Sequence, residues 1–130
     1  MKPDLTYQDS DLLLDCTQLT GLAARYGTPL YIYSAASLRS QAMRLMQSLG
    51  TIGSLHYAVK ANTNPSLLKM IFSMGFGADT VSLGEIQAAL DAGCPARNIV
   101  FSGVGKRPDE LAFALDHDIF INAESEEEIA

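Results

Sequence analysis

One lysine stands where a strand-like segment gives way to a polar link. Residues 55–59 are mainly apolar, Lys60 follows them at once, and residues 61–65 are a mainly polar run that ends in proline. An amine at the carboxyl end of a parallel strand lies where barrel enzymes place their chemistry, and desolvation there frees it to attack a carbonyl. The alternative is a solvated lysine at a strand end. The position of Lys60 alone is compatible with both interpretations.

The same strand would place two further side chains beside this lysine. Because alternate residues of a strand share a face, His56 and Ala58 should point the same way as Lys60, whereas Tyr57 and Val59 should point the other way. The small Ala58 leaves room for a flat ring next to the amine. His56 would lie two layers deeper, so we predict a hydrogen-bonded core histidine there and no catalytic role.

The second half of the chain alternates strand-like and helix-like segments. We predict strands over 55–59, 78–82, 98–102 and 118–122, helices over 66–74, 83–92 and 108–115, and a fourth helix capped by Ser125. The strands begin roughly 20 to 24 residues apart, which is typical of repeated βα units. Short links between strands and helices imply a parallel sheet, in either a doubly wound fold or a (β/α)₈ barrel.

The placement of glycines argues against the nucleotide-binding version of such a fold. A dinucleotide site usually has Gly-x-Gly-x-x-Gly after its first strand, yet residues 60–64 contain no glycine. Gly75 and Gly77 precede a strand, and Lys106 is not followed by the Ser or Thr of a phosphate loop. A complete barrel needs about 250 residues. We therefore expect an α/β fold that is the N-terminal half of a (β/α)₈ TIM-like barrel, truncated after about four strands.

The first fifty residues follow a different pattern. We predict an apolar run at 12–14, a helix over 19–26 stopped by Gly27 and Pro29, a strand over 30–33, and a helix that is capped by Ser34 and ends before Gly50. We divide the chain into residues 1–33, an N-terminal segment outside the parallel sheet, and residues 34–130, the first part of the barrel.

Composition narrows the class of protein. Hydrophobic residues make up 48% of the 130 residues and charged residues 18%, which excludes a disordered or fibrous chain. The net charge of -6 argues against nucleic-acid binding, and no apolar stretch is long enough to span a membrane. Cys16 and Cys94 fit no metal-ligand spacing, and residues 1–4 do not begin a secretory leader. A cytoplasmic protein with reduced thiols is expected.

Several segments, in order, resemble one family of enzymes. Residues 57–62, Tyr-Ala-Val-Lys-Ala-Asn, resemble the cofactor-lysine motif of the pyridoxal-phosphate-dependent ornithine, diaminopimelate and arginine decarboxylases. Residues 77–86, 99–106 and 121–125 are similar to the family's next three strand segments, and residues 27–33 are most similar to its diaminopimelate branch. The likeness runs from about Leu13 to the end of the chain. It implies an alanine-racemase-like barrel of fold type III among pyridoxal-phosphate enzymes.

The resemblance assigns roles to four side chains. It implies that Lys60 carries pyridoxal 5'-phosphate covalently and that Ala58, Asp79 and Glu85 lie against the same cofactor. A carboxylate beside the amine holds it as an ammonium and stages its proton for transfer. A turn position for Asp79, and a position favoured by the helix dipole for Glu85, are the purely structural alternatives.

The resemblance also implies an activity. In the full-length enzyme it is decarboxylation of meso-2,6-diaminopimelate to L-lysine, in lysine biosynthesis, by a homodimer, and we expect this chain alone to be inactive. Alternatives are a decarboxylase of ornithine, arginine or a related basic amino acid, an amino-acid racemase, and a non-catalytic protein that binds pyridoxal phosphate. The family's phosphate loop, pyridine-nitrogen partner, catalytic cysteine and substrate-binding β-domain would lie beyond residue 130. Residues 1–33 are expected to pack on that β-domain.

The remaining polar residues receive simpler predictions. Ser102 and Lys106 flank a strand-end loop that could reach the substrate side of the pocket. His117, between two aspartates, is expected to be a solvated loop residue. Glu124 and residues 126–128 are expected to form the solvated start of a helix.

Overall fold

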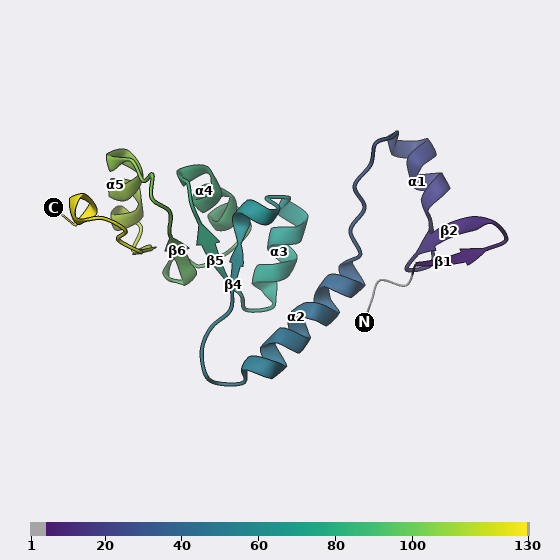
Figure 1. Cartoon of the computed structure of the whole chain (residues 1–130), viewed down its shortest axis with the longest axis horizontal. Helices are drawn as coiled ribbons and strands as arrows, with labels where there is room; N and C mark the ends of the chain where they lie inside the picture. Colours follow the sequence, from purple (N-terminus) through teal and green to yellow (C-terminus); the bar gives the residue numbers. More distant parts are fainter. Residues whose placement is uncertain (1–4, 130) are drawn as a thin grey trace. The chain divides into compact units, whose positions relative to one another are not determined.

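The structure is a computed structural model that describes residues 5–129. It divides into two compact units, with the boundary between Ser48 and Leu49 (Figure 1). No helix within residues 5–129 is both long enough and apolar enough to cross a membrane.

The first unit contains a small antiparallel sheet and two helices. Its strands pair in the order β1-β2-β3, with β1 at Leu5–Gln8, β2 at Asp11–Leu14 and β3 at Thr17–Gln18, and its helices are α1 (Leu19–Tyr26) and α2 (Ala35–Leu49). The turn between β1 and β2 consists of Asp9 and Ser10, whose φ angles are 48° and 74°. Positive φ at both central residues suits the twist of a two-residue hairpin. This sheet was not predicted from the sequence, because neither the turn between β1 and β2 nor the turn between β2 and β3 has the Asn-Gly pair that is typical of hairpins.

Both helices of this unit agree with the prediction, but one predicted strand does not. Gly27 has φ +83° and ends α1 by donating its N–H to the carbonyl of Ala23 at 2.8 Å, and the Ser34 hydroxyl accepts the Ser37 N–H at 2.9 Å to start α2. The strand predicted over residues 30–33 is wrong, since this segment is exposed and irregular. Its β-branched and aromatic residues favour a strand, but a strand also needs a neighbour to pair with.

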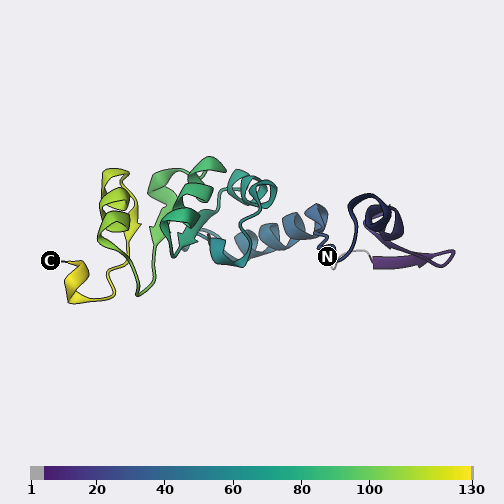
Figure 2. The same ribbon diagram turned by 90° about the horizontal axis from the view of Figure 1, so that it is seen from above.

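The second unit is a parallel sheet with helical crossovers. Its strands are β4 (His56–Ala58), β5 (Gly77–Thr80), β6 (Ile99–Phe101) and β7 (Phe120–Ile121), paired in the order β4-β5-β6-β7. The helices between them are α3 (Pro65–Ser73), α4 (Leu83–Asp91) and α5 (Pro108–Asp116). In Figure 2 these helices follow one another along the unit in the order of their strands. The predicted alternation and the sequential parallel order are confirmed. The predicted fourth helix is wrong as far as the structure describes it, because residues Glu126–Glu128 form only a 3-10 turn, η3.

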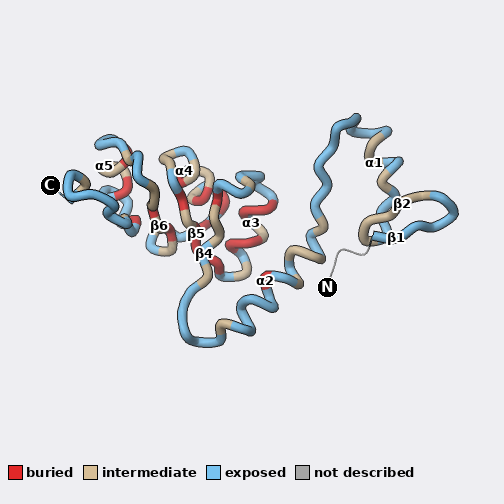
Figure 3. The backbone as a smooth tube through the Cα atoms, in the orientation of Figure 1, coloured by how far each residue is buried: buried red, intermediate tan, exposed pale blue. Residues whose placement is uncertain are grey.

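The two faces of this sheet differ in burial. On one face, Tyr57 lies beside Ala78, Ala78 beside Ile99, and Thr80 beside Phe101. Most of these side chains are fully buried against the helices (Figure 3). The other face carries the row Ala58, Asp79, Val100 and Phe120, which is half-buried or exposed within the described part of the unit. We call this second surface the open face. In a closed barrel it would be the interior.

His56 lies on the open face, and its predicted place in the core is wrong. The residue is exposed, as Phe120 is at the other end of this face. The ring is nevertheless hydrogen-bonded, with Nε2 3.0 Å from the Ser54 hydroxyl and Nδ1 3.4 Å from the Ala78 carbonyl oxygen. It lies over Gly77, where an added Cβ would come within 2.5 Å of Nδ1.

Candidate active site

Lys60 lies at the carboxyl end of β4, as predicted, but in a turn and not in the strand. Residues Val59–Ala61 form a 3-10 turn, η1, in which Val59 is fully buried and Lys60 is exposed. The turn is closed by the Asn62 N–H, which donates to the Val59 carbonyl at 3.1 Å, and by the Tyr57 hydroxyl, which donates to the Asn62 carbonyl at 3.2 Å. Strand alternation therefore stops at Ala58 and does not set the direction of the Lys60 side chain.

The helix that follows fixes this turn from the other side. The Asn64 side-chain oxygen accepts the N–H groups of Ser66 at 2.9 Å and Leu67 at 3.4 Å, and Pro65 occupies the first helical position. This is a strong N-cap. The polar run after Lys60 is thus the start of α3, and it holds the lysine in a short, well-anchored link.

Asp79 belongs to β5 and is the neighbour of Ala58 in the register. It is half-buried on the open face, and its Oδ1 accepts a hydrogen bond from the Ser102 hydroxyl at 2.9 Å. The Ser102 oxygen in turn accepts the side-chain N–H of Asn122 at 3.1 Å. Three neighbouring strands therefore contribute one polar side chain each, at or just past their carboxyl ends. Asn122 was not identified as a site residue from the sequence. The signal was its spacing, because Asn122 follows Phe120 by two residues, as Ser102 follows Val100.

Glu85 occupies the first turn of α4 and contacts the backbone. Its Oε2 accepts the Val81 N–H at 2.9 Å, while the Ser82 hydroxyl accepts the Glu85 N–H at 3.3 Å. A carboxylate at a helix N-terminus is favoured by the orphan N–H groups and by the helix dipole. Glu85 therefore occupies the helix-start position that was the structural alternative to cofactor binding. Its contact with a cofactor stays a prediction.

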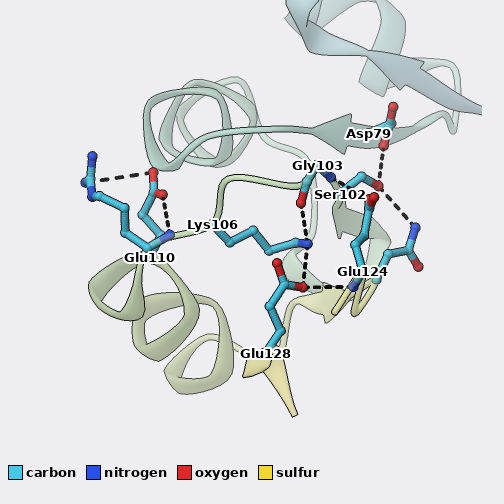
Figure 4. Close-up of polar contacts among 9 residues, drawn as sticks. Asp79, Ser102, Gly103, Lys106, Glu110, Glu124 and Glu128 are labelled. Carbon is cyan, nitrogen blue, oxygen red and sulfur yellow. Dashed lines mark hydrogen bonds and ion pairs between the residues drawn. The ribbon is translucent and has the colours of Figure 1, made fainter. Parts of the chain in front are cut away.

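Lys106 and the acidic segment after β7 form a network that the sequence did not reveal. Lys106 Nζ donates to the Gly103 carbonyl at 2.6 Å and to Glu128 Oε2 at 2.9 Å, and the Gly103 N–H donates to Glu124 Oε1 at 2.8 Å. The hydrogen bond from the Glu124 N–H, followed by that from Lys106, lowers the pKa of Glu128. The prediction of a solvated position is wrong for Glu128, whose side chain is 9% exposed, whereas Glu124 is exposed as predicted and also accepts a hydrogen bond. The Lys106 amine is engaged in this network (Figure 4).

Glu110 sets the spacing of two helix N-termini. Its Oε1 accepts the Leu83 N–H, at the start of α4, and its Oε2 accepts the Arg107 N–H, at the start of α5, both at 3.0 Å. The residue is only 6% exposed. These backbone hydrogen bonds, first that of Leu83, lower the pKa of the carboxyl group. One buried carboxylate therefore holds together the loops that follow β5 and β6.

His117 is exposed at the end of α5, as predicted. Its Nδ1 lies 2.8 Å from the Phe113 carbonyl oxygen, and its ring stacks on the Phe113 ring with centroids 3.9 Å apart. These contacts are local to the helix end and give His117 no connection to the open face.

Comparison with known proteins connects this arrangement to one family. The model of the pyridoxal-dependent decarboxylases, pyridoxal binding domain, matches residues 35–130. The diaminopimelate decarboxylase of Aquifex aeolicus is 41% identical over 128 residues, which cover 98% of this chain and 30% of that protein. That of Campylobacter jejuni is 44% identical over 110 residues, or 83% of this chain and 27% of that protein.

Solved structures agree in fold. Diaminopimelate decarboxylase from M. jannaschii superposes on 96% of this chain, and 31% of its own, with a TM-score of 0.91 at 28% identity. The Helicobacter pylori enzyme complexed with L-lysine covers 85% of this chain, and 29% of its own, with a TM-score of 0.77 at 41% identity. A Paramecium bursaria Chlorella virus arginine decarboxylase, 23% identical with a TM-score of 0.73, shares the fold.

The chain matches only part of its relatives. The chain spans about 30% of the length of the Aquifex aeolicus relative. The predicted fold class, an α/β fold corresponding to the first part of the decarboxylase barrel, is confirmed by these structures and by the parallel sheet. The predicted cofactor is likewise that of the matching family. This chain belongs to the pyridoxal-dependent decarboxylases, whose pyridoxal-binding domain it matches over residues 35–130.

Proposed function

We propose that the whole protein is a diaminopimelate decarboxylase, which converts meso-2,6-diaminopimelate to L-lysine and carbon dioxide in lysine biosynthesis. The observation that carries this proposal is the pattern of identities. The diaminopimelate decarboxylases of Aquifex aeolicus and M. jannaschii are 41% and 28% identical over nearly the entire chain, whereas an arginine decarboxylase and a lysine/ornithine decarboxylase of similar fold are 23% and 21% identical over 85% of it. The proposal includes a cytoplasmic location, as expected from the cysteines and the first residues, and a homodimer, as the family resemblance implies.

The residues at the carboxyl ends of β4 and β5 suit pyridoxal 5'-phosphate. Within residues 5–129 the Lys60 amine makes no hydrogen bond or ion pair, so it is available to bond a carbonyl carbon. Ala58 adds only a methyl group to the open face beside Asp79, which leaves space for a planar ring. Asp79 supplies an acceptor whose Oδ1 is already oriented by Ser102.

In the mechanism that we propose, this part of the chain binds the cofactor and handles a proton. Pyridoxal phosphate, when bound, acts as an electron sink for the bond that the substrate loses. Lys60 would hold the cofactor covalently through Nζ. Asp79 would hold that amine as an ammonium whenever the substrate displaces it, and so keep a proton at Nζ for transfer. Glu85 would lie near the same cofactor while it caps α4.

The N-terminal residues are proposed to serve a different domain. Residues 1–33 would pack on the C-terminal β-domain of the whole protein, and residues 34–130 would form the first part of the barrel. The exposed side chains of Leu30, Tyr31 and Tyr33 support this role, because apolar groups of that size are normally covered by another surface.

Borohydride trapping in the whole protein tests the role of Lys60. With pyridoxal phosphate, reduction should fix the cofactor on Lys60, and both this label and release of carbon dioxide from meso-diaminopimelate should be lost in Lys60→Ala. Lys60→Arg should keep the charge and also fail, because a guanidinium does not form the bond. Lys69→Ala, on the exposed side of α3, is the matched control and should behave as the parent.

The possible results separate the parts of the proposal. Decarboxylation by Lys60→Ala at the parental rate would contradict the mechanism. Labelling of Lys60 with faster turnover of ornithine or arginine would contradict only the assigned substrate. Labelling without turnover of any basic amino acid would favour a non-catalytic homologue, and inversion of an amino acid without loss of carbon dioxide would favour a racemase.

A further inference from the structure

Ser102 and Asn122 extend the parallel ladder past the ends of their strands. The Ser102 N–H donates to the Thr80 carbonyl at 2.8 Å, and the Asn122 N–H donates to the Phe101 carbonyl at 3.0 Å. Each residue stands two positions after a residue of the open face, so its side chain lies on that face. The side chains of Asp79, Ser102 and Asn122 form one chain of hydrogen bonds, of which Figure 4 labels Asp79 and Ser102.

This chain of hydrogen bonds has one direction. The side-chain nitrogen of Asn122 can only donate, so the Ser102 oxygen accepts from it at 3.1 Å. The single hydroxyl proton of Ser102 is then committed to Asp79 Oδ1, 2.9 Å away. An ionised aspartate has two oxygens and only accepts hydrogen bonds. The serine therefore fixes one oxygen of Asp79 and leaves Oδ2 for another donor.

The backbone beneath Ser102 is held independently of its hydroxyl. Gly103 is bonded on both sides, since its N–H donates to Glu124 at 2.8 Å and its carbonyl accepts from Lys106 at 2.6 Å. Together with the ladder bond from Ser102 to Thr80, these contacts keep the loop in place when the side chain is removed. Loss of the Ser102 hydroxyl should therefore let the Asp79 side chain adopt more rotamers and leave the fold unchanged.

We propose that Ser102 and Asn122 are positioning residues that orient Asp79, so that its Oδ2 faces the cofactor-binding amine of Lys60. This inference rests on the proposed role of Asp79. A free carboxylate on an open face would populate several rotamers, and only some of them place an oxygen toward the amine. The serine, polarised by the asparagine, selects one rotamer before the cofactor arrives, which is preorganisation of the kind that enzyme sites require.

The test uses the whole protein with Ser102→Ala, Ser102→Thr and Asn122→Asp. Two quantities are measured: the rate at which borohydride-trappable pyridoxal phosphate accumulates on Lys60, and kcat and KM for meso-diaminopimelate. In Ser102→Ala we expect both the trapping rate and kcat to fall about ten- to hundredfold, with KM changed by less than about threefold. Threonine keeps the hydroxyl, so Ser102→Thr should recover most of both rates.

The asparagine variant tests the direction of the hydrogen bonds. Aspartate at position 122 presents an acceptor to the hydroxyl and competes with Asp79 for its one proton, so both rates should fall. In the double variant with Ser102→Ala the further loss should be small, because the two residues act through one path. Ser73→Ala is the matched control, since Ser73 is exposed and its hydroxyl donates to the Met70 carbonyl of its own helix, α3, at 2.7 Å.

The outcomes distinguish this inference from the proposed function. Slower trapping in Ser102→Ala, recovered by Ser102→Thr, supports it even if the parent turns over a different amino acid. Parental trapping and parental kcat in Ser102→Ala would overturn it. Equal losses in Ser102→Ala and Ser102→Thr, accompanied by a lower melting temperature, would overturn it in favour of a structural role. A parent that neither traps the cofactor nor releases carbon dioxide would overturn both proposals.

Discussion

Lys106 and Glu128 form an ion pair of 2.9 Å in which the two side chains are only 1% and 9% exposed. Lys106 follows β6 and Glu128 follows β7, so the pair joins the segments that leave two neighbouring strands. Removing one partner of a shielded pair leaves the other charge uncompensated. The pair therefore holds together the loops at the carboxyl ends of these strands, next to Ser102 and Asn122.

Replacing Lys106 should loosen the loops at the carboxyl ends of β6 and β7. In Lys106→Met the Gly103 carbonyl loses the lysine donor, and Glu128 loses its cation while it keeps the hydrogen bond from the Glu124 N–H. The backbone amides of Gly103 and Glu124 should therefore exchange with solvent faster. Hydrogen exchange resolved by residue measures this effect, and the melting temperature should fall. Lys69→Met is the control, because Lys69 is exposed on α3. Equal exchange in both variants would contradict the assigned role of the pair.

Glu110 should make the stability of the second unit depend on pH. Its folded pKa lies below the ordinary value of 4.5, so the stabilisation is present above that value and is lost as the pH falls through the folded pKa. Glutamine can accept at only one of the two positions, so Glu110→Gln should cost about 1–3 kcal/mol at neutral pH. This difference should shrink as the pH falls from 5 to 3.

Urea unfolding across that pH range measures the effect of Glu110. Asp109→Asn serves as the control, because Asp109 is exposed and its ion pair, 3.0 Å long, is with the exposed Arg107 side chain. Its substitution should change stability little at any pH. A Glu110→Gln variant whose deficit stayed constant down to pH 3 would show that the charge of Glu110 is not what stabilises the two helix starts.

Gly77 should tolerate no side chain. A Cβ there would lie 2.4 Å from the Asn98 carbonyl oxygen and 2.5 Å from His56 Nδ1, and the backbone contact cannot relax cheaply. We expect Gly77→Ala to destabilise the protein by about 1–3 kcal/mol in urea unfolding. Gly53→Ala, where a Cβ meets nothing within 4 Å, is the control and should be nearly neutral. Similar losses in both variants would contradict the predicted clash.

The two cysteines should differ sharply in reactivity. Cys94 is 3% exposed, and burial raises its pKa to about 11, so little thiolate is present at pH 8. Cys16 is exposed. Iodoacetamide followed by peptide mapping should label Cys16 in the native protein, and both residues in urea. Native labelling of Cys94 at the rate of Cys16 would mean that the link before η2 (Ala96–Asn98) is open.

The parallel sheet could be predicted because its signals are local. In the structure α3, α4 and α5 begin at Pro65, Leu83 and Pro108, within one residue of the starts predicted at 66, 83 and 108. Periodicity and caps within ten residues suffice for such elements. The position of Lys60 at a strand end followed from the same reasoning, combined with a family motif.

The features of the fold and the site that were not predicted depend on contacts between residues far apart in the chain. Glu128 lies 22 residues from Lys106, and Asn122 lies 20 residues from Ser102, so no local pattern shows that they meet. Residues 30–33 were predicted as a strand from propensity, which does not say whether a partner strand exists. The exposure of His56 has a similar cause, because burial depends on what covers the open face.

The strand order β4-β5-β6-β7 also bears on how the chain is made. From β5 onward, each strand pairs with the strand synthesised immediately before it, so only β4, the first strand of the described sheet, waits for a later strand to find its register. A ribosome that adds about 5–20 residues per second delivers a βα unit of about 20 residues every 1 to 4 s. Secondary structure and loop closure take microseconds. The sheet can therefore extend from its N-terminal edge in step with translation, with each new unit docking on a surface that is already folded.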